Sequence, residues 1–325
     1  MTSSGRDLGA SVAGGAAMPT VGDAHGADGD RNLSYESGLE VEVRSQWTYA
    51  RRRFFRHRLA VISLVILFIV LGAGAFAPWV APYSFEGYDV NSIQQAPSWK
   101  HPFGTDLLGR DYLSRVIYGI RTSERVAFIV ASLTVLIGTL IGMVAGYFGG
   151  WVDNALMRLT DLILTLPGLA VLLTAAAFLG HGSMYRVAII LALLLWTALA
   201  RLVRGQFLSL REKEYVDAAK AAGAGDMRIM FRHMLPNSMG PIIVSGTLTL
   251  GLAIILEAAL SFLGFGVLPP TPALGKLIAD GQDVSSHAWW LVTFPGLTIV
   301  LIVLCVNFIG DGLRDALDPT QRVRA

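Results

Sequence analysis

Apolar residues of this chain are gathered into six long runs, and polar segments separate the runs. A hydrocarbon core takes about 20 helical residues to cross, and each run approaches or exceeds that length. Within lipid no water can satisfy an open backbone, so the runs are predicted to be helices. The predicted spans are residues 59–81, 126–148, 160–180, 186–203, 241–265 and 290–310. The expected fold class is therefore an all-α membrane protein with six transmembrane helices.

The composition agrees with lipid as the solvent. Of the 325 residues, 53% are hydrophobic and 15% are charged, whereas about a quarter of the residues in a soluble domain are charged. The formal net charge of +2 is small, and the arginines are confined to particular segments instead of forming one basic face. Membrane lipid is therefore an expected partner, and nucleic acid is not.

The chain divides into five segments around these spans. Residues 1–45 are rich in Gly, Ala, Ser and Asp without apolar periodicity, which predicts a disordered tail. The first apolar run begins only after residue 58, unlike that of a signal peptide, and is expected to be kept as a span. The predicted segments are the tail 1–45, a basic flank with the first span 46–82, a loop 83–125, a five-helix core 126–312 and a tail 313–325.

Arginines before the first span predict the orientation of the chain. Five of the eight residues 51–58 are arginines, and such flanks favour the cytoplasmic side. The N-terminus is therefore expected in the cytoplasm, and parity places the loop 204–240 and the C-terminal tail there as well. The loop 83–125 is then extracytoplasmic despite its own basic residues, because long loops constrain topology weakly. Its last part, 111–125, is predicted to be an interfacial amphipathic helix.

Glycines recur at intervals of four in the second predicted span, at Gly138, Gly142 and Gly146. Small residues at this spacing let two transmembrane helices approach closely, and such packing contributes much to helix association in lipid. A close helix contact is therefore predicted along this stripe. The pattern favours helix packing without indicating one particular function.

The cytoplasmic loop before the fifth span carries the most information. Residues 214–222 are strong helix formers with small residues on one side, and Gly223 and Gly225 end that helix. A second short helix, 226–234, is predicted to stop before Pro236, because the residue before a proline avoids the helical region. The result is a bent helical pair with an exposed face of small residues, Ala218, Ala219 and Ala222. Such a surface suits a groove in a partner protein.

This segment resembles the EAA loop of binding-protein-dependent ABC importer permeases. The family pattern is Glu-Ala-Ala, three residues, Gly, nine residues and Ile-x-Leu-Pro. Two positions depart from it, because Asp217 replaces Glu and His233 stands where the family has Ile. The spacing and the place in the chain are kept. The matching positions are Asp217, Ala218, Ala219, Gly223, His233, Leu235 and Pro236.

Other segments resemble the second-permease type of the dipeptide and oligopeptide branch: HPFGTDLLGRDYLSRVIYGIRTS from His101, EAALSFLGFGV from Glu257, and FPGLTIVLIVLCVNFIGDGLRDALDP from Phe294. The resemblance covers nearly all of residues 47–320. It implies a type I importer in a bacterial cytoplasmic membrane, moving di- or oligopeptides. Its other expected parts are a homologous first permease, two ATPase subunits that bind ATP and Mg²⁺, and an extracytoplasmic solute-binding protein. The EAA segment would be the coupling helix that docks on an ATPase.

No catalytic, cofactor or metal site is expected within this chain. A phosphate-binding loop needs a Gly five positions before the Gly of its Gly-Lys pair and Ser or Thr after the Lys, and Gly275-Lys276 has Pro270 and Leu277 there. The six histidines have no metal-ligand spacing, and His233 is interpreted as a packing or docking residue. Cys305 lies in an apolar run and is expected to be a packing residue.

A few charged residues lie within the predicted spans. Glu257 lies deep in the fifth span, where an ionisable group is costly and is by default a functional hypothesis. It is a candidate for the translocation path, and the alternatives are a partner-chain ion pair or the cap of a broken helix. Arg158 and Asp161 are predicted to form a local ion pair. Asn307 and Asp311, near the end of the sixth span, fit either a structural or a functional role.

Three alternatives to a peptide importer stay open. Relatives in the same branch carry nickel, haem or glycosylated compounds, and the separate binding protein largely sets the cargo. A self-sufficient secondary transporter would usually show inverted repeats and matched intramembrane charges, which this sequence does not display. A membrane scaffold that transports nothing would have no need of a docking loop with this spacing.

Overall fold

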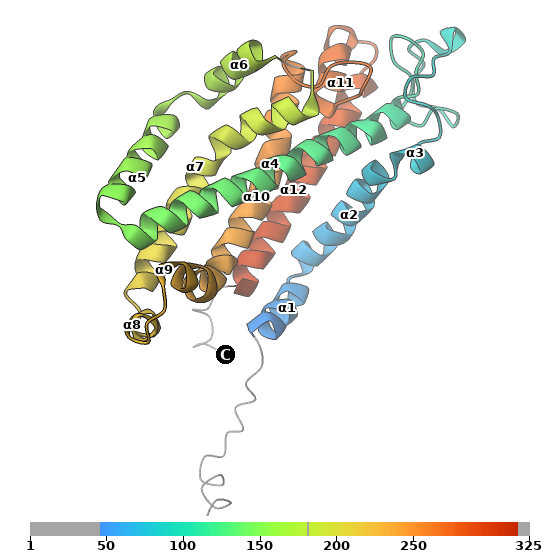
Figure 1. The fold of residues 1–325 in the computed structure, drawn as a ribbon. Helices are drawn as coiled ribbons and strands as arrows, with labels where there is room; N and C mark the ends of the chain where they lie inside the picture. The colour runs from blue at the N-terminus through green and yellow to red at the C-terminus, as the bar shows by residue number, and fades with distance from the viewer. Residues whose placement is uncertain (1–45, 181, 318–325) are drawn as a thin grey trace, which may run out of the picture. The chain divides into compact units, whose positions relative to one another are not determined.

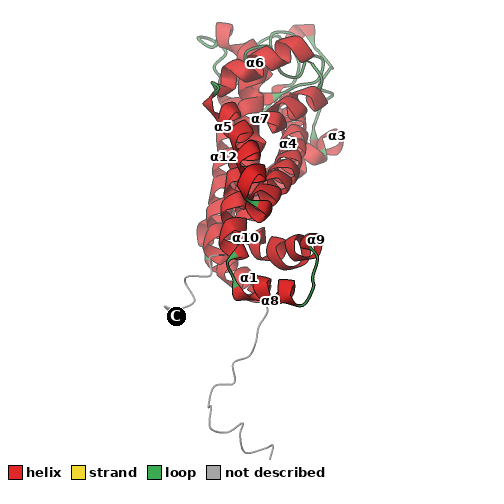
Figure 2. Ribbon diagram, turned by 60° about the vertical axis from the view of Figure 1, so that its left-hand side comes forward, coloured by secondary structure: helices red, strands yellow, loops and turns green. Residues whose placement is uncertain are grey.

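The apolar runs form long helices, which are drawn as coiled ribbons in Figure 1. The computed structural model describes residues 46–180 and 182–317, so the predicted tail 1–45 and most of the tail 313–325 lie outside the described residues. Apart from two isolated bridges, the regular structure described is helical (Figure 2). The longer helices are α1 Gln46–Arg56, α2 Arg58–Ala75, α3 Ala77–Val80, α4 Tyr112–Phe148, α5 Gly150–Thr165, α6 Gly168–Leu179, α7 Met184–Arg211, α8 Glu214–Ala221, α10 Leu235–Phe262, α11 Leu274–Gly281 and α12 Trp290–Leu317. The shorter ones are α9 Asp226–Arg228, the 3₁₀ turns Val90–Ser92 and Gln282–Val284, and the π-helix Ile229–Met234.

Among the described residues, five helices are long and apolar enough to cross a membrane. They are α2, α4, α7, the continuous stretch 226–262 that ends with α10, and α12. In Figure 1, α1, α8 and α9 lie at one end of the bundle and α6 and α11 at the other, here called the α8 end and the α11 end. The prediction of an all-helical membrane protein is confirmed.

The third predicted span, 160–180, is wrong as a single helix. The structure has α5 and α6 instead, bent by 92° to one another, and a sixth span exists only if this pair counts as one. Leu166 has an extended backbone, with φ −77° and ψ 141°, and Pro167 follows it. A proline disfavours the helical region for the residue before it, so the helix ends there.

The predicted helix 111–125 is present and leads into the second span, and its place at a membrane interface stays a prediction. It forms the first turns of α4, which continues without a break to Phe148. Tyr112 is buried there, and its hydroxyl donates to the carbonyl oxygen of Leu291 at 2.5 Å. Gly119 lies close against Leu274 of α11. These turns are part of the core, because small and apolar side chains face α11 and α12.

The loop before α4 is organised by two buried carboxylates. Asp111 caps α4: one oxygen accepts from the backbone N–H of Ser114 at 2.8 Å and the other lies 2.8 Å from Nδ1 of His101. Asp106 accepts from the backbone N–H of Arg110 at 2.9 Å and from its Nε at 2.7 Å. The loop is thereby folded tightly onto the α11 end of the bundle.

The glycine stripe of α4 lies directly against α7, which confirms the predicted close contact. A Cβ on Gly138 would lie 2.9 Å from the carbonyl oxygen of Trp196, and a Cβ on Gly146 would lie 2.8 Å from that of Arg204. Real Cβ atoms do not tolerate such distances from backbone, so only glycine allows the two helices to pack this closely. The contact joins the two ends of the bundle.

Two groups of buried apolar residues make up the core. The larger lies toward the α11 end and joins α4, α6, α7, α10, α11 and α12. The smaller, here called the α8-end cluster, lies where α4 and α7 meet the segment after α7. Its members are Met143, Tyr147, Leu199, Val203, Phe207, Val216, Ile229, Met230, Met234 and Ile242.

Replacement of Gly142 by alanine is expected to destabilise the α4–α7 contact. The new Cβ would press on the carbonyl oxygen of Ala200 and lie 2.8 Å from Cβ of Val203. Overpacking of this kind costs about 1–3 kcal/mol, and each kcal/mol lowers the unfolding temperature by roughly 2–4 °C in a chain of this size. Thermal unfolding in detergent measures the shift. Gly72→Ala in α2, where no atom lies within 4 Å, is the control, and equal losses in both variants would contradict the prediction.

Candidate functional site

The predicted docking segment begins with α8, which ends in a glycine-dependent cap. Gly223 has φ +80°, the left-handed region in which other residues are strained by about 1–2 kcal/mol. Its N–H donates to the carbonyl oxygen of Lys220 at 2.9 Å, and the N–H of Ala224 donates to that of Ala219 at 3.0 Å. These two bonds are the Schellman arrangement that satisfies the last carbonyls of a helix. The prediction that Gly223 ends the helix is confirmed.

One side of α8 is fixed to the bundle and the other is exposed. Val216 is fully buried in the α8-end cluster, and half-buried Ala219 packs against the same cluster. Ala218 and Ala222 are exposed, as is Asp217, whose Oδ1 lies 3.2 Å from Nζ of Lys220. The predicted small-residue face is therefore correct for Ala218 and Ala222 but wrong for Ala219, because α8 is turned so that Val216 and Ala219 face inward.

A π-helical turn connects α9 to α10 and overturns the predicted stop before Pro236. The N–H of Leu235 donates to the carbonyl oxygen of Met230, five residues earlier. Pro236 then lies in the first turn of α10, where a helix needs no N–H from it. The backbone is helical without interruption from Asp226 to Phe262. No break in the helix therefore separates α9 from α10.

The second half of the EAA-like pattern lies on this junction. The carbonyl oxygen of half-buried His233 accepts from Nδ2 of Asn237 at 2.6 Å. Leu235 packs against the α8-end cluster, and Pro236 is exposed. The π turn contacts α8, so the two halves of the pattern form one unit. Among the described residues, no three His, Cys, Asp or Glu side chains are grouped in a way that could hold a metal ion.

A hydrogen bond ties this unit to α4. The hydroxyl of Tyr147 donates to Oδ1 of Asp226, the first residue of α9, at 2.6 Å. Nη1 of Arg211, at the end of α7, donates to the carbonyl oxygen of Tyr147 at 3.2 Å. Asp226 and Tyr147 are 79 positions apart in the sequence, and no local pattern could have brought them together. The helix entry at Asp226 was predicted, but its partner was not.

Ion pairs fix α5 against α7 near the same end. Nη2 of Arg204 donates to Oδ2 of Asp153 at 2.6 Å. Asp161 pairs with Arg201, so the predicted pair with Arg158 is wrong. The physical reason is that α5 packs on α7, and the carboxylate meets an arginine from the facing helix instead of one on its own helix.

Glu257 is placed apart from the docking segment, in the middle of the core. It is fully buried, and its two oxygens accept from Oγ of Ser123 on α4 and Oγ of Ser261, each at 2.7 Å. The carboxyl thus joins α10 to α4 within this chain. A role for Glu257 in lining the path stays a prediction. Cys305 is buried, as expected for a packing residue, while Asn307 and Asp311 are exposed.

Two family models match the chain. Residues 138–323 match the family model described as binding-protein-dependent transport system inner membrane component. The chain belongs to this family. Residues 45–97 match a second model, the N-terminal transmembrane domain of oligopeptide transport permease C. The first match contains α8 and the π turn, and the second contains α1 and α2.

The chain is also similar to curated permeases over most of its length. It is 41% identical to the dipeptide transport system permease protein DppC of Alkalihalophilus pseudofirmus, covering 86% of this chain and 91% of that protein. It is 39% identical to the oligopeptide transport system permease protein OppC of Haemophilus influenzae, covering 87% and 92%. The OppC of Mycobacterium tuberculosis is 39% identical, covering 87% and 97%. The chain is a multi-pass membrane permease.

Loss of the Tyr147 hydroxyl is expected to loosen the unit formed by α8, α9 and the π turn, here called the docking unit. Tyr147→Phe removes a hydrogen bond to a carboxylate, a class of bond that contributes about 1.5–3 kcal/mol. Amide hydrogen exchange in residues 214–228 should then accelerate roughly tenfold or more, measured by mass spectrometry. Tyr185→Phe, an exposed tyrosine on α7, is the matched control. Unchanged exchange in residues 214–228 would show that the bond does not hold the unit.

Substitutions at Glu257 separate a structural role from a path-lining role. Glu257→Gln keeps the volume and can bond both serines, so stability should change little, whereas Glu257→Ala leaves the serines unpaired and should cost about 1–3 kcal/mol or more. Thermal unfolding of both variants, together with transport assays, checks this. Transport lost in Glu257→Gln at unchanged stability would favour the path, and transport that follows stability would favour the buried bridge.

Proposed function

We propose that the chain is one of two permease subunits of an ATP-binding-cassette importer, and that the importer moves di- and oligopeptides into a bacterial cell. The observation that carries the proposal is the exposed, glycine-capped α8, which has the EAA spacing and is fixed rigidly to the spans. The names of the relatives, dipeptide and oligopeptide permeases similar over 86–87% of this chain, support the peptide cargo. The same coupling geometry would serve nickel, haem or glycosylated cargo, and no feature of the described residues favours those compounds.

In this proposal α8 is the coupling helix. A separate ATPase subunit binds ATP and Mg²⁺ and receives α8 in a cleft, while this chain supplies no catalytic residue and no cofactor. The exposed Ala218 and Ala222 let a cleft wall come close, and a Cβ at Gly223 would meet no atom within 4 Å. The side chains of Asp217 and Lys220 add one negative and one positive charge to the exposed side of α8. Closure of the ATPase pair would displace α8 and, through the α8-end cluster, the spans.

The proposal also assigns the two sides of the membrane. The α8 end, where α1 begins and α12 ends, would lie in the cytoplasm together with the segments before α1 and after α12, which agrees with the arginines of α1 at that end. The loop with Asp106 and Asp111 would face the outside, where a solute-binding protein delivers the peptide. A homologous first permease would complete the pathway. Two ATPase subunits would then serve the two permeases.

Substitutions of Gly223 test the coupling helix. Gly223→Ala imposes only the strain of the left-handed backbone, because its Cβ has open space, and should weaken ATPase binding roughly tenfold. Gly223→Glu adds bulk and charge at the proposed contact and should abolish binding. Gly225→Ala is the control, because Gly225 has φ −70° and open space as well. The measurement is co-elution of ATPase subunits with the tagged permease from solubilised membranes, quantified by mass spectrometry.

Two results would contradict the proposal. If ATPases co-elute equally with wild type and Gly223→Glu, α8 is not the docking element. If the purified chain alone moves peptides into proteoliposomes without ATP, it is a secondary transporter. Transport assays with dipeptides, oligopeptides and nickel in the reconstituted complex test the cargo separately from the coupling.

A further inference from the structure

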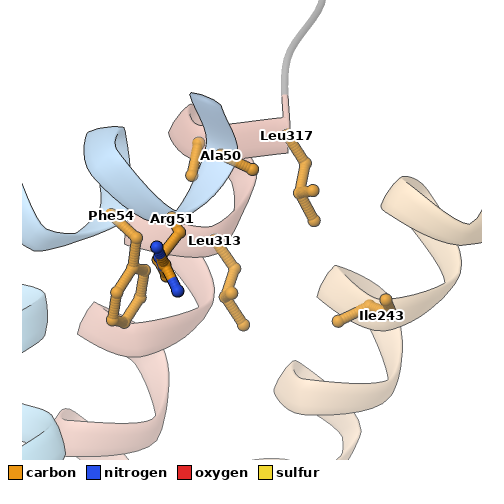
Figure 3. Close-up of a pocket in the computed structure, with 7 residues that line it drawn as sticks. Ala50, Arg51, Phe54, Ile243, Leu313 and Leu317 are labelled. Atoms are coloured by element: carbon orange, nitrogen blue, oxygen red, sulfur yellow. The ribbon is translucent and has the colours of Figure 1, made fainter. Parts of the chain in front are cut away.

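A cavity of about 410 Å³ lies at the α8 end, between α1, α10 and α12, and the docking segment takes no part in it. Figure 3 shows its lining side chains. All but one are apolar, and the exception is Arg51. The lining residues are Ala50, Arg51, Phe54, Ile243, Leu313, Ala316 and Leu317.

The guanidinium of Arg51 is available to a ligand. Its nitrogens lie between the side chains of Phe54 and Leu313 in Figure 3. Within the part of the chain that the structure describes, Arg51 has no hydrogen bond or ion pair. An ion pair in this region joins Asp315 to His57 at 3.9 Å, and neither residue lines the cavity. The cavity therefore combines a long apolar wall with one unpaired cation.

The surroundings of the cavity favour an anion from the membrane. Helix α1 has the sequence QWTYARRRFFR, with four arginines and no acid, and Arg58 follows it. It directly precedes α2, which is long and apolar enough to span a membrane, so α1 lies at the level of the lipid headgroups. Arginines at this level attract anionic lipids, and basic pockets between spans bind their headgroups.

We propose that this cavity binds one anionic phospholipid, with the phosphate at Arg51 and an acyl chain along Phe54, Ile243 and Leu313. A free phosphate would meet the charge but leave the apolar walls exposed to water, whereas a lipid satisfies both. The volume lies within the roughly 300–1,000 Å³ of ordinary ligand pockets. A lipid at this site would join α1 to α10 and α12, close to the place where α12 packs on α1.

Native mass spectrometry of the purified permease tests the site. The protein is equilibrated with vesicles of equal parts phosphatidylglycerol and phosphatidylcholine, and the retained lipids are counted. Arg51→Gln should reduce retained phosphatidylglycerol roughly tenfold, as expected when a hydrogen bond to a charged group in the cavity is lost. Arg52→Gln is the matched control, because Arg52 is an exposed neighbour on α1 that does not line the cavity. The amount of phosphatidylglycerol that Arg52→Gln retains should stay at the wild-type level.

A second variant tests the apolar wall. Leu313→Trp fills the cavity without removing a charge, so it should lower retention as Arg51→Gln does, and glycerophosphoglycerol, which lacks acyl chains, should not be retained. If Arg51→Gln and Arg52→Gln lose equal amounts of retained phosphatidylglycerol, the proposed site is wrong and α1 is only attracted to anionic surfaces in general. Full retention in Arg51→Gln would overturn the proposal, and so would a crosslink from position 313 to a partner subunit in the assembled complex. None of these results depends on peptide transport or ATPase docking.

Discussion

The contact between α4 and α7 determines where most of the other elements lie. Lipid gives two helices no hydrophobic reason to associate, so close backbone packing has to hold them. Gly138, Gly142 and Gly146 provide it over three successive turns, each against the backbone or Cβ of α7. With the two helices in register, Tyr147 and Phe207 meet at the α8 end, and the α8-end cluster forms around them.

The rigidity of the docking unit follows from that register. Val216, Met230 and Met234 are buried in the cluster that α4 and α7 create, and the Tyr147 hydroxyl then reaches Asp226. The exposed side of α8 is left with small residues and a glycine cap. A helix that is packed on one side and exposes small side chains on the other is physically suited to transmit a displacement from a partner. Little of the motion is lost in local bending.

The sequence predicted those features that depend on local chemistry. Residue type and spacing determine the end of the helix at Gly223, the glycine stripe and most of the spans. The structure contains all three features. The failures have tertiary causes. Pro236 does not end a helix because a π turn places it where no N–H is required, and Asp161 prefers Arg201 because α5 packs on α7. The Pro167 break could have been found from the sequence, because the rule applied to Pro236 applies to it as well.

The break at Pro167 distinguishes the α5–α6 pair from the long continuous helices of the bundle. Helix α4 has 37 residues without interruption, about 55 Å at the helical rise, and it reaches from the capped Asp111 to Tyr147 beside the docking unit. The continuous stretch from Asp226 to Phe262 has the same length. A displacement of α8 would therefore reach the α11 end through two long helices, which Ser123 and Glu257 join in the half nearer that end. The α5–α6 pair turns by 92° at Pro167, which has no N–H to donate, so this pair lacks the continuous helical backbone that stiffens α4 and the stretch 226–262.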